Sequence, residues 1–260
     1  MKRRHFLGTA LFAGGSMVAG GIAFSSLRAA VAGEGKKKWG YTGEAAPDNW
    51  GHLSPEYKVC QAGSQQSPID LKQAVDADLS RLKIRYKDLP LKILNNGHTI
   101  QVNAVPGNRL ILDGTPFELL QFHFHHPSEH TVKGKDYPME VHFVHQSKTG
   151  ELAVLGIFLK KGRENAALKP VWEAMPANKQ AEKQISDVTV DIASILPVDR
   201  STYRYFGSLT TPPCSEVVRW VVFEEPIEVS KAQIEQFKQI FPLNARPVQP
   251  LNRRFLLMSR

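Results

Sequence analysis

Residues 121–130 read QFHFHHPSEH and place four histidines and a glutamate within ten positions. Alternate residues of a β-strand point to the same side, so His123 and His125 would share one face. In the segment EVHFVH, which begins at Glu140, the same alternation puts Glu140 and His142 on one face. If these segments pair as antiparallel strands, three imidazoles converge and could bind one metal ion. Spacing alone leaves a second interpretation open, in which the histidines are hydrogen-bonded core residues or lie on a solvated face.

Three histidine ligands and an open fourth position are typical of catalytic zinc sites, whereas structural zinc sites usually have four protein ligands. Metal-bound histidines also need an acceptor for their second ring N–H. Gln121 and Glu140 lie on the same strand faces as the histidines and could provide it. A zinc protease of the helical type would contain the motif HExxH, which the sequence lacks.

Short runs of alternating apolar residues, divided by turn signals such as Asn96-Gly97 and Asp113-Gly114, surround these histidines. This pattern is typical of antiparallel strands joined by tight turns. We expect strands in LKIRY (82–86), LKILN (91–95), TIQVNAV (99–105), RLILD (109–113), FELLQFHFH (117–125), MEVHFVH (139–145) and LAVLGIFLK (152–160).

Helices are expected to be few. One should cover part of 164–182, and a longer one should begin at Ser230, where Ser230 and Gln233 form a capping box, and end at Pro242. We find no internal repeat and no sign of a second domain. The sequence therefore predicts a single, mainly β domain (mixed α/β by count) in residues 33–260.

The basic charge of the chain is concentrated at its start. The sequence has 33 lysines and arginines against 25 aspartates and glutamates, a formal net charge of +8. Four of the basic residues and none of the acidic ones lie in residues 1–32, which leaves +4 for the rest. Basic residues are not interleaved with aromatic ones, so the composition argues against nucleic acid as a partner.

Residues 1–32 have the features of a cleaved export signal. A basic start precedes an apolar stretch at 6–24 and AVA at 30–32, a small-x-small cleavage site. RRHFL at 3–7 resembles the twin-arginine signal. About 20 apolar residues could instead span a bilayer, but the glycines in this stretch make it a poor permanent anchor. We expect a periplasmic or secreted protein with no membrane anchor after signal cleavage.

Cys60 and Cys214 are the two cysteines of the chain. In an exported protein an even number of cysteines usually forms disulfides, and two cysteines allow one pairing. The chain-entropy model gives this bond roughly 5 kcal/mol of stabilisation as an upper estimate. Two buried thiols or two metal ligands are the alternatives, although no CxxC or Cys-x-His spacing supports cysteine ligands.

Nine short motifs occur in one order between residues 39 and 254. They are WGY (39–41), QSPIDL (66–71), ILNNGH (93–98), QFHFH (121–125), SEHT (128–131), MEVHFVH (139–145), LAVLGIFL (152–159), SLTTPPC (208–214) and RPVQPLNRR (246–254). Together they resemble the α-class carbonic anhydrases, and the ordered set is far more specific than any single motif.

The resemblance implies a large central, mostly antiparallel, twisted sheet of about ten strands with short helices on its surface. One Zn²⁺ per chain would be held in a conical cleft by His123, His125 and His142, with Gln121 and Glu140 as acceptors for their rings. The implied enzyme is a zinc lyase. A zinc-bound hydroxide would hydrate carbon dioxide reversibly to bicarbonate and a proton.

The resemblance also assigns roles to residues around the metal. Thr210 would accept the hydrogen bond of the hydroxide and donate in turn to Glu129, and Thr211 would help to place the substrate. The apolar wall of the carbon dioxide pocket would consist of Val144, Val154, Leu209, Val218 and Trp220.

His98 matches the family histidine that passes the proton to bulk solvent. An imidazole suits this task because its unperturbed pKa lies near 6.5, so it can both take and give a proton. Tyr41 and Asn96 match residues that order the intervening waters, and Gln101 stands where the family often has asparagine.

The sequence departs from animal members of the family at His126, where tryptophan is common, and in a shorter connection to Ser128, as in bacterial members. We interpret His126, His130 and His145 as structural or surface residues. Exported members often form a homodimer, but no motif here marks an interface. A non-catalytic binding module would lack a zinc histidine, and a zinc-storage protein would have a mobile His-rich tract.

Overall fold

The computed structural model describes residues 38–259 of the chain. The predicted export signal, residues 1–32, lies outside the described residues. Within the described part, no helix is both long enough and apolar enough to cross a membrane.

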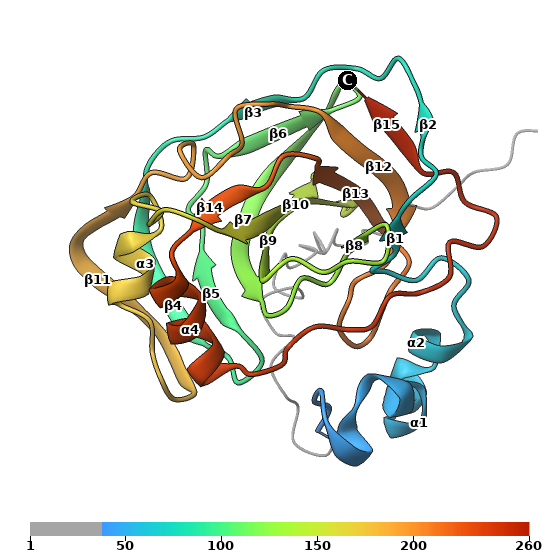
Figure 1. Ribbon diagram of the computed structural model, residues 1–260, viewed down its shortest axis with the longest axis horizontal. Coiled ribbons are helices and arrows are strands. Elements are labelled where there is room, and N and C mark those ends of the chain that lie inside the picture. The colour runs from blue at the N-terminus through green and yellow to red at the C-terminus, as the bar shows by residue number, and fades with distance from the viewer. Residues whose placement is uncertain (1–37, 260) are drawn as a thin grey trace, which may run out of the picture. The chain divides into compact units, whose positions relative to one another are not determined.

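One large mixed sheet dominates the described residues, and most of its strand pairs are antiparallel (Figure 1). Its order is β11-β4-β5-β7-β9-β10-β13-β12-β15-β2, with β14 beside β10 and with β6 beside β3 and β7. The strands are β2 (Val75–Asp76), β3 (Lys83–Arg85), β4 (Leu89–Asn95), β5 (Ile100–Asn103), β6 (Arg109–Leu112), β7 (Thr115–His125), β9 (Met139–Ser147), β10 (Leu152–Lys161), β11 (Gln180–Val190), β12 (Thr202–Gly207), β13 (Val218–Phe223), β14 (Ile227–Val229) and β15 (Leu257–Ser259). A separate two-stranded sheet joins β1 (Asp70–Leu71) to β8 (Thr131–Val132).

The predicted fold class is confirmed, and each strand expected from alternation is present. The sheet of the described chain has thirteen strands rather than about ten. The figure of about ten came from the family resemblance, and the observed count includes strands of only two or three residues, such as β2, β14 and β15. Such strands are too short to produce a recognisable alternation of apolar and polar residues.

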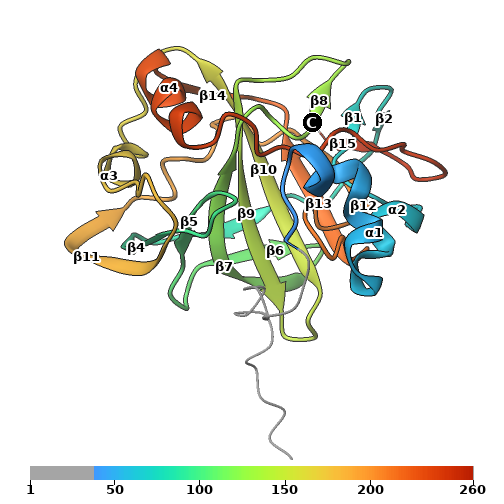
Figure 2. The same ribbon diagram turned by 90° about the horizontal axis from the view of Figure 1, so that it is seen from below.

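Helices are short and lie beside the sheet (Figure 2). They are α1 (Trp50–Leu53), α2 (Val59–Ala62), α3 (Lys169–Glu173) and α4 (Lys231–Ile240), with 3₁₀ turns at Gly43–Ala45, Pro47–Asn49 and Pro55–Tyr57. The predicted capping box of α4 is confirmed, because Ser230 Oγ accepts from the N–H of Gln233 and the Gln233 side chain accepts from the N–H of Ser230. These bonds satisfy donors that a helix start otherwise leaves unpaired.

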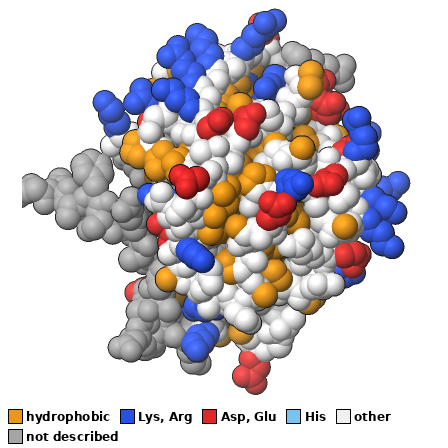
Figure 3. Space-filling model, turned by 90° about the vertical axis from the view of Figure 1, so that its left-hand side faces the viewer, with side chains coloured by type: hydrophobic (Ala, Val, Ile, Leu, Met, Phe, Trp, Pro, Cys, Tyr) orange, Lys and Arg blue, Asp and Glu red, His pale blue; other side chains and the backbone are white. Residues whose placement is uncertain are grey.

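The edge strand β11 was not predicted. Nearly all of its side chains are exposed, so it lacks the burial alternation of a half-buried strand. Its pairing with β4 is interrupted by register shifts, and irregularities of this kind discourage edge-to-edge association. β11 belongs to the left-hand side of Figure 1, and on that side of the molecule acidic, basic and apolar side chains are intermixed (Figure 3).

An irregularity in β7 sets which of its side chains enter the core. Leu119 pairs with His145 and Gln121 pairs with Val144, so one extra residue of β7 is inserted between these pairs. Before the insertion, the odd-numbered Phe117 and Leu119 are buried in the main core; after it, the even-numbered Phe122 and Phe124 are. The side chains at 121, 123 and 125 therefore lie on the face opposite the main core.

The disulfide between Cys60 and Cys214 is present, with the two Cα atoms 4.9 Å apart. It connects α2, in the N-terminal lead-in, to the loop that contains Thr210 and Thr211. Trp50 packs in the same cluster, and its indole N–H donates to the carbonyls of Gly40 and Ala45. The lead-in is thereby fixed to the body of the domain.

His145 is buried in the main core, where Nε2 hydrogen-bonds the hydroxyl of Tyr86 at 2.7 Å. Burial lowers the pKa of His145 to about 4, against the opposing effect of hydrogen bonds with the backbone of Ala153 and Phe143. The folded protein therefore holds this ring neutral at pH values where the unfolded chain would protonate it. The interpretation of His145 as a structural residue agrees with this position.

Removing the disulfide should destabilise the fold. Because the bond closes a loop of 154 residues, the Cys60→Ser/Cys214→Ser protein should lose about 3–5 kcal/mol of unfolding free energy. Urea denaturation with and without dithiothreitol measures this loss. The double variant, which should not respond to the reductant, is the control, and coincident midpoints for oxidised and reduced wild type would contradict the prediction.

Acid should weaken the fold through His145. Its folded pKa of about 4 lies below the unfolded value, so the unfolded state binds the extra proton as pH falls from 6.5 to 4. The unfolding free energy should decrease over this range by about 3 kcal/mol from this residue. Urea denaturation at pH 7.5 and pH 4 should show a smaller decrease for His145→Gln than for wild type or for exposed His52→Gln, and equal decreases would rule the effect out.

Candidate metal centre

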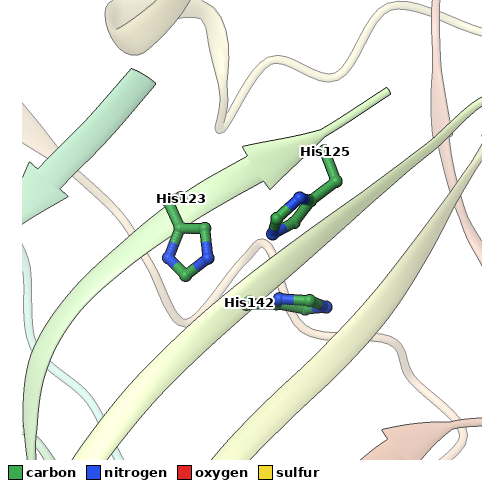
Figure 4. A group of neighbouring side chains, drawn as sticks. All are labelled: His123, His125 and His142. Atoms are coloured by element: carbon green, nitrogen blue, oxygen red, sulfur yellow. The ribbon is translucent and has the colours of Figure 1, made fainter. Parts of the chain in front are cut away.

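Three imidazoles meet where β7 and β9 lie side by side (Figure 4). His123 is paired with His142 across the two strands, and His125 lies two residues further along β7. The ring centroids of His142 are 5.4 Å from His123 and 4.5 Å from His125, and one nitrogen of each ring lies within 4.8 Å of the others. The antiparallel pairing thus brings together the three histidines selected from the sequence.

Two of the rings are held by acceptors on their own strands. Gln121 Oε1 accepts from Nδ1 of His123 at 2.8 Å, and Glu140 Oε1 accepts from Nε2 of His142 at 2.8 Å. An imidazole that donates through one nitrogen presents a lone pair on the other. His123 therefore presents Nε2 and His142 presents Nδ1 to the space between the rings.

The third ring is held by a residue that sequence reasoning missed. The backbone carbonyl of Asn244 accepts from Nδ1 of His125 at 2.7 Å. Any residue type has a carbonyl, and Asn244 is 119 positions away from His125, so no local pattern could have pointed to it. His125 consequently presents Nε2.

The environment favours the neutral form of two of the three rings, those of His123 and His125. Burial, followed by the proximity of His125 and His142, lowers the pKa of His123 well below its usual value. Burial is also the main cause of the lowered pKa of His125. Burial by itself would raise the pKa of Glu140. The nearby imidazoles of His130 and His142 act in the opposite direction, through charge and through hydrogen bonds, and together they lower this pKa well below the usual range. The site thus combines two imidazoles that resist protonation with an anionic carboxylate that hydrogen-bonds the third.

The donor set fits a zinc ion. His125 Nε2 is buried and has no hydrogen-bond partner within the described chain, and neither has Glu129 Oε2, 3.4 Å away. Leaving a buried polar nitrogen unpaired costs about 1–3 kcal/mol, and a cation between the rings would satisfy it. Three neutral imidazole nitrogens are the ligands of a catalytic zinc site with an open position.

Glu129 lies beside the imidazoles. Its Oε1 accepts from the backbone N–H of Arg246 at 2.9 Å, while Oε2 faces His125 rather than a hydroxyl. Thr210 is buried in the neighbouring loop, but no hydrogen bond joins it to Glu129 among the described residues. The contact between Thr210 and Glu129 stays a prediction. Thr211 is partly exposed in the same loop.

The five apolar residues selected from the sequence share one cluster. Val154, Val218 and Trp220 are buried, and Val144 and Leu209 pack against them. The indole of Trp220 lies 4.9 Å from the ring of His142, and its N–H donates to the carbonyl of Ser208 at 3.0 Å. An apolar surface thus borders the imidazole group on the side of β13.

His98 and its predicted neighbours form a second group. The His98 ring stacks on Trp39, with centroids 3.7 Å apart and planes 9° from parallel. Asn96 Oδ1 accepts from the N–H of His98, and Asn96 Nδ2 donates to Gln101 Oε1 at 3.3 Å. Burial, followed by the charge of Lys179, lowers the pKa of His98 to about 4.

Gln101 and Tyr41 complete the group around His98. Gln101 pairs with His123 across β5 and β7, so it lies beside the imidazole group. Tyr41 packs edge-on against Trp39 at 5.7 Å.

His130 is more deeply buried than the sequence suggested. Its Nδ1 hydrogen-bonds Glu140 Oε1 at 2.8 Å and its Nε2 hydrogen-bonds the Tyr205 hydroxyl at 2.6 Å, which in turn donates to Ser67 Oγ at 3.0 Å. Both ring nitrogens are therefore already paired, as befits a structural residue. His126, with Nδ1 2.9 Å from the carbonyl of Pro242, is also structural.

Known proteins are similar to this chain in sequence and in fold. A family model described as eukaryotic-type carbonic anhydrase matches residues 45–260. A carbonic anhydrase of Nostoc sp. is 49% identical over 242 residues, covering 91% of this chain and 92% of the relative. A carbonic anhydrase of Klebsiella pneumoniae is 45% identical over 223 residues, covering 84% and 90%.

Among solved structures, the α-carbonic anhydrase of Thermovibrio ammonificans with sulfanilamide superposes with a TM-score of 0.82 at 48% identity. The match covers 87% of this chain and all of that one. Family model, relatives and fold agree over most of the chain. This chain therefore belongs to the α-class carbonic anhydrase family and is an enzyme of that family.

Proposed function

We propose that this enzyme hydrates carbon dioxide reversibly to bicarbonate and a proton, with one Zn²⁺ held by His123, His125 and His142. The observation that carries the proposal is the unpaired, buried Nε2 of His125, in a group where one nitrogen of each of the three rings lies within 4.8 Å of the others. Bound zinc would supply the Lewis acidity that deprotonates a water molecule near neutral pH.

Residues behind the ligands would tune and orient them. Gln121, Glu140 and the carbonyl of Asn244 each hold one ring nitrogen, which fixes the tautomer and the ring plane. Such partners also raise the basicity of the metal-bound nitrogen. Glu129 would act from the side of the open position, where Thr210 would connect its carboxylate to the reacting oxygen.

The substrate is small and apolar, and an apolar surface beside the metal suits it. Val144, Val154, Leu209, Val218 and Trp220 would bind carbon dioxide next to His142. Thr211 would help to place it. Water and ions gain little from such a surface, so carbon dioxide could reach the metal without displacing tightly bound solvent.

Each turnover leaves a proton that must reach solvent, and His98 would carry it. The ring is partly exposed, and its near neighbour Asn96 donates to Gln101, whose partner across the strands is His123. Asn96, Gln101 and Tyr41 would order the water molecules between the metal and His98. The stacked ring has a low pKa, so proton uptake would be favoured when the imidazole moves away from Trp39 into water.

We further propose that residues 1–32 direct export to the periplasm or out of the cell, followed by cleavage, leaving residues 33–260 as the mature domain. The Cys60–Cys214 disulfide supports this proposal, because such bonds persist in oxidising compartments.

Replacing a metal ligand tests the central proposal. His123→Ala should lower zinc content well below one ion per chain and reduce carbon dioxide hydration at least about 100-fold, because two imidazoles bind zinc weakly. Zinc analysis and stopped-flow hydration on the same sample measure both effects. His126→Ala, a neighbouring histidine outside the group, should retain both properties. Wild-type protein that binds zinc without hydrating carbon dioxide would overturn the proposal.

Replacing His98, the proposed proton carrier, should slow the transfer of the proton to solvent and leave the hydration step unchanged. His98→Ala should lower kcat about 10-fold or more in weak buffer, leave kcat/KM unchanged, and recover on addition of imidazole, because proton transfer follows the chemical step. Stopped-flow hydration across a buffer series measures this, with exposed His52→Ala as the control. A kcat equal to that of wild type in weak buffer would exclude His98 from proton transfer.

A further inference from the structure

A hollow of about 310 Å³ lies where β12, β13 and β15 run side by side. β12 and β15 are at the upper right of Figure 1. In the antiparallel register Arg204 is opposite Val221 and Leu257, and Phe206 is opposite Arg219. Directly opposed side chains point to the same face of a sheet, so these five residues line the hollow together.

The hollow and the candidate metal centre lie on opposite faces of β13. Val221 packs in the main core, whereas its neighbour Trp220 packs in the cluster that borders the imidazole group. Successive side chains of a strand point to opposite faces of the sheet. A ligand in the hollow would therefore bind without touching a metal ion held by the imidazoles.

The outer part of the hollow is apolar. Phe255 is 76% exposed and Phe206 is 43% exposed, and Leu79 and Leu257, which are partly exposed, line the same hollow. Apolar side chains are stabilised when another apolar group covers them. Large exposed apolar side chains gathered at a concave surface indicate a binding site for such a group.

A buried guanidinium forms part of the wall. Arg204 is only 8% exposed, and its Nη2 donates to the carbonyl of Ser80 at 2.7 Å. Its Nη1 is buried and has no hydrogen-bond partner within the described residues. The Asp113 carboxylate lies 3.5 Å from Nη1, in an ion pair without a hydrogen bond. A buried cationic N–H without an acceptor is costly, so this donor would gain from a better-placed carboxylate.

Cations outnumber anions in the hollow. Arg204 and Arg219 line it, and Asp113 is the one acid among the described residues that do. Outside the hollow, Glu151 accepts from Nη2 of Arg219 at 3.0 Å. The Asp113 side chain is 51% exposed and belongs to the turn between β6 and β7, and an ion pair of such an exposed group contributes little stability. Its carboxylate is therefore easily displaced.

We propose that this hollow binds a small organic carboxylate with an apolar body. The apolar body lies against Phe206 and Phe255. The carboxylate displaces that of Asp113 from Nη1 of Arg204, and Arg219 supplies a second positive charge. This site goes beyond the proposed hydration of carbon dioxide and does not depend on it.

A second copy of the chain is the alternative occupant of the apolar surface. It would cover the exposed phenylalanines, but the unpaired Nη1 belongs to a residue of the wall that is almost fully buried. A ligand small enough to enter the hollow brings the apolar group and the missing acceptor together. The volume also lies near the lower end of the range for small-molecule sites, roughly 300–1,000 Å³.

The test measures binding of 3-phenylpropanoate to the purified enzyme by isothermal titration calorimetry, with the neutral 3-phenylpropanamide as the matched ligand. Asp113→Asn removes the competing carboxylate, and asparagine tolerates the positive φ of 49° at this position. Arg204→Gln and Arg219→Gln each remove one cation. Arg163→Gln is the control, because Arg163 is also paired with a glutamate at 3.0 Å and does not line the hollow.

We expect Asp113→Asn to bind the carboxylate about 2–5-fold more tightly than wild type, because a weak ion pair no longer competes. Arg204→Gln should weaken binding about 10-fold or more and Arg219→Gln about 3-fold, whereas Arg163→Gln should bind as wild type does. The amide should bind at least about 10-fold more weakly than the carboxylate.

Equal affinity for the amide and the carboxylate would reduce the site to apolar contact and overturn the inference. Unchanged affinity in Asp113→Asn and Arg219→Gln would do the same, because it would place the ligand elsewhere, the metal included. These two variants decide the matter if Arg204→Gln does not fold. A dimer in sedimentation velocity that Phe255→Ser converts to a monomer unable to bind the carboxylate would assign the surface to a second copy instead.

Discussion

The register between β7 and β9 is the constraint on which the site depends. It places His123 opposite His142, and the residue inserted after Leu119 turns His123 and His125 away from the main core. A slip of one residue would reverse the faces of a whole strand, because side chains alternate with a period of two. The slip would bury imidazoles among the phenylalanines and expose Phe122 and Phe124. The burial of these aromatic rings therefore enforces the same register that brings the imidazoles together.

Around this pair of strands, buried polar groups are held by partners from distant parts of the chain. Arg246 donates its backbone N–H to Glu129, and its guanidinium donates to the carbonyls of Cys60 and Ser67. Glu140 accepts from the N–H groups of Glu129 and His130 as well as from two imidazoles. Buried polar groups are costly when unpaired, so the site, the disulfide and the C-terminal segment stabilise one another.

The features that could be predicted from the residues themselves are those set by short, local patterns in the sequence. Alternation along a single strand places Gln121 and His123 on one face of β7, and Glu140 and His142 on one face of β9. The capping box of α4 lies within four residues. Sequence reasoning missed β11, because an exposed, bulged strand has no alternation to detect. It also missed Asn244 and the full burial of His130, because their partners lie on other segments. Assignments such as Thr210 and His98 came from family resemblance, since a threonine or a partly exposed histidine alone has no distinctive spacing.

The position of Asn244 has a consequence for biosynthesis. The three histidines all lie between residues 123 and 142, whereas the acceptor of His125 follows it by 119 positions. During translation the strands β7 and β9 emerge well before this acceptor is added to the chain. An ion captured by the nascent protein would meet a His125 ring that nothing yet orients. The metal site therefore forms fully only after the chain has been synthesised past residue 244, which favours metal loading late in the folding of this domain.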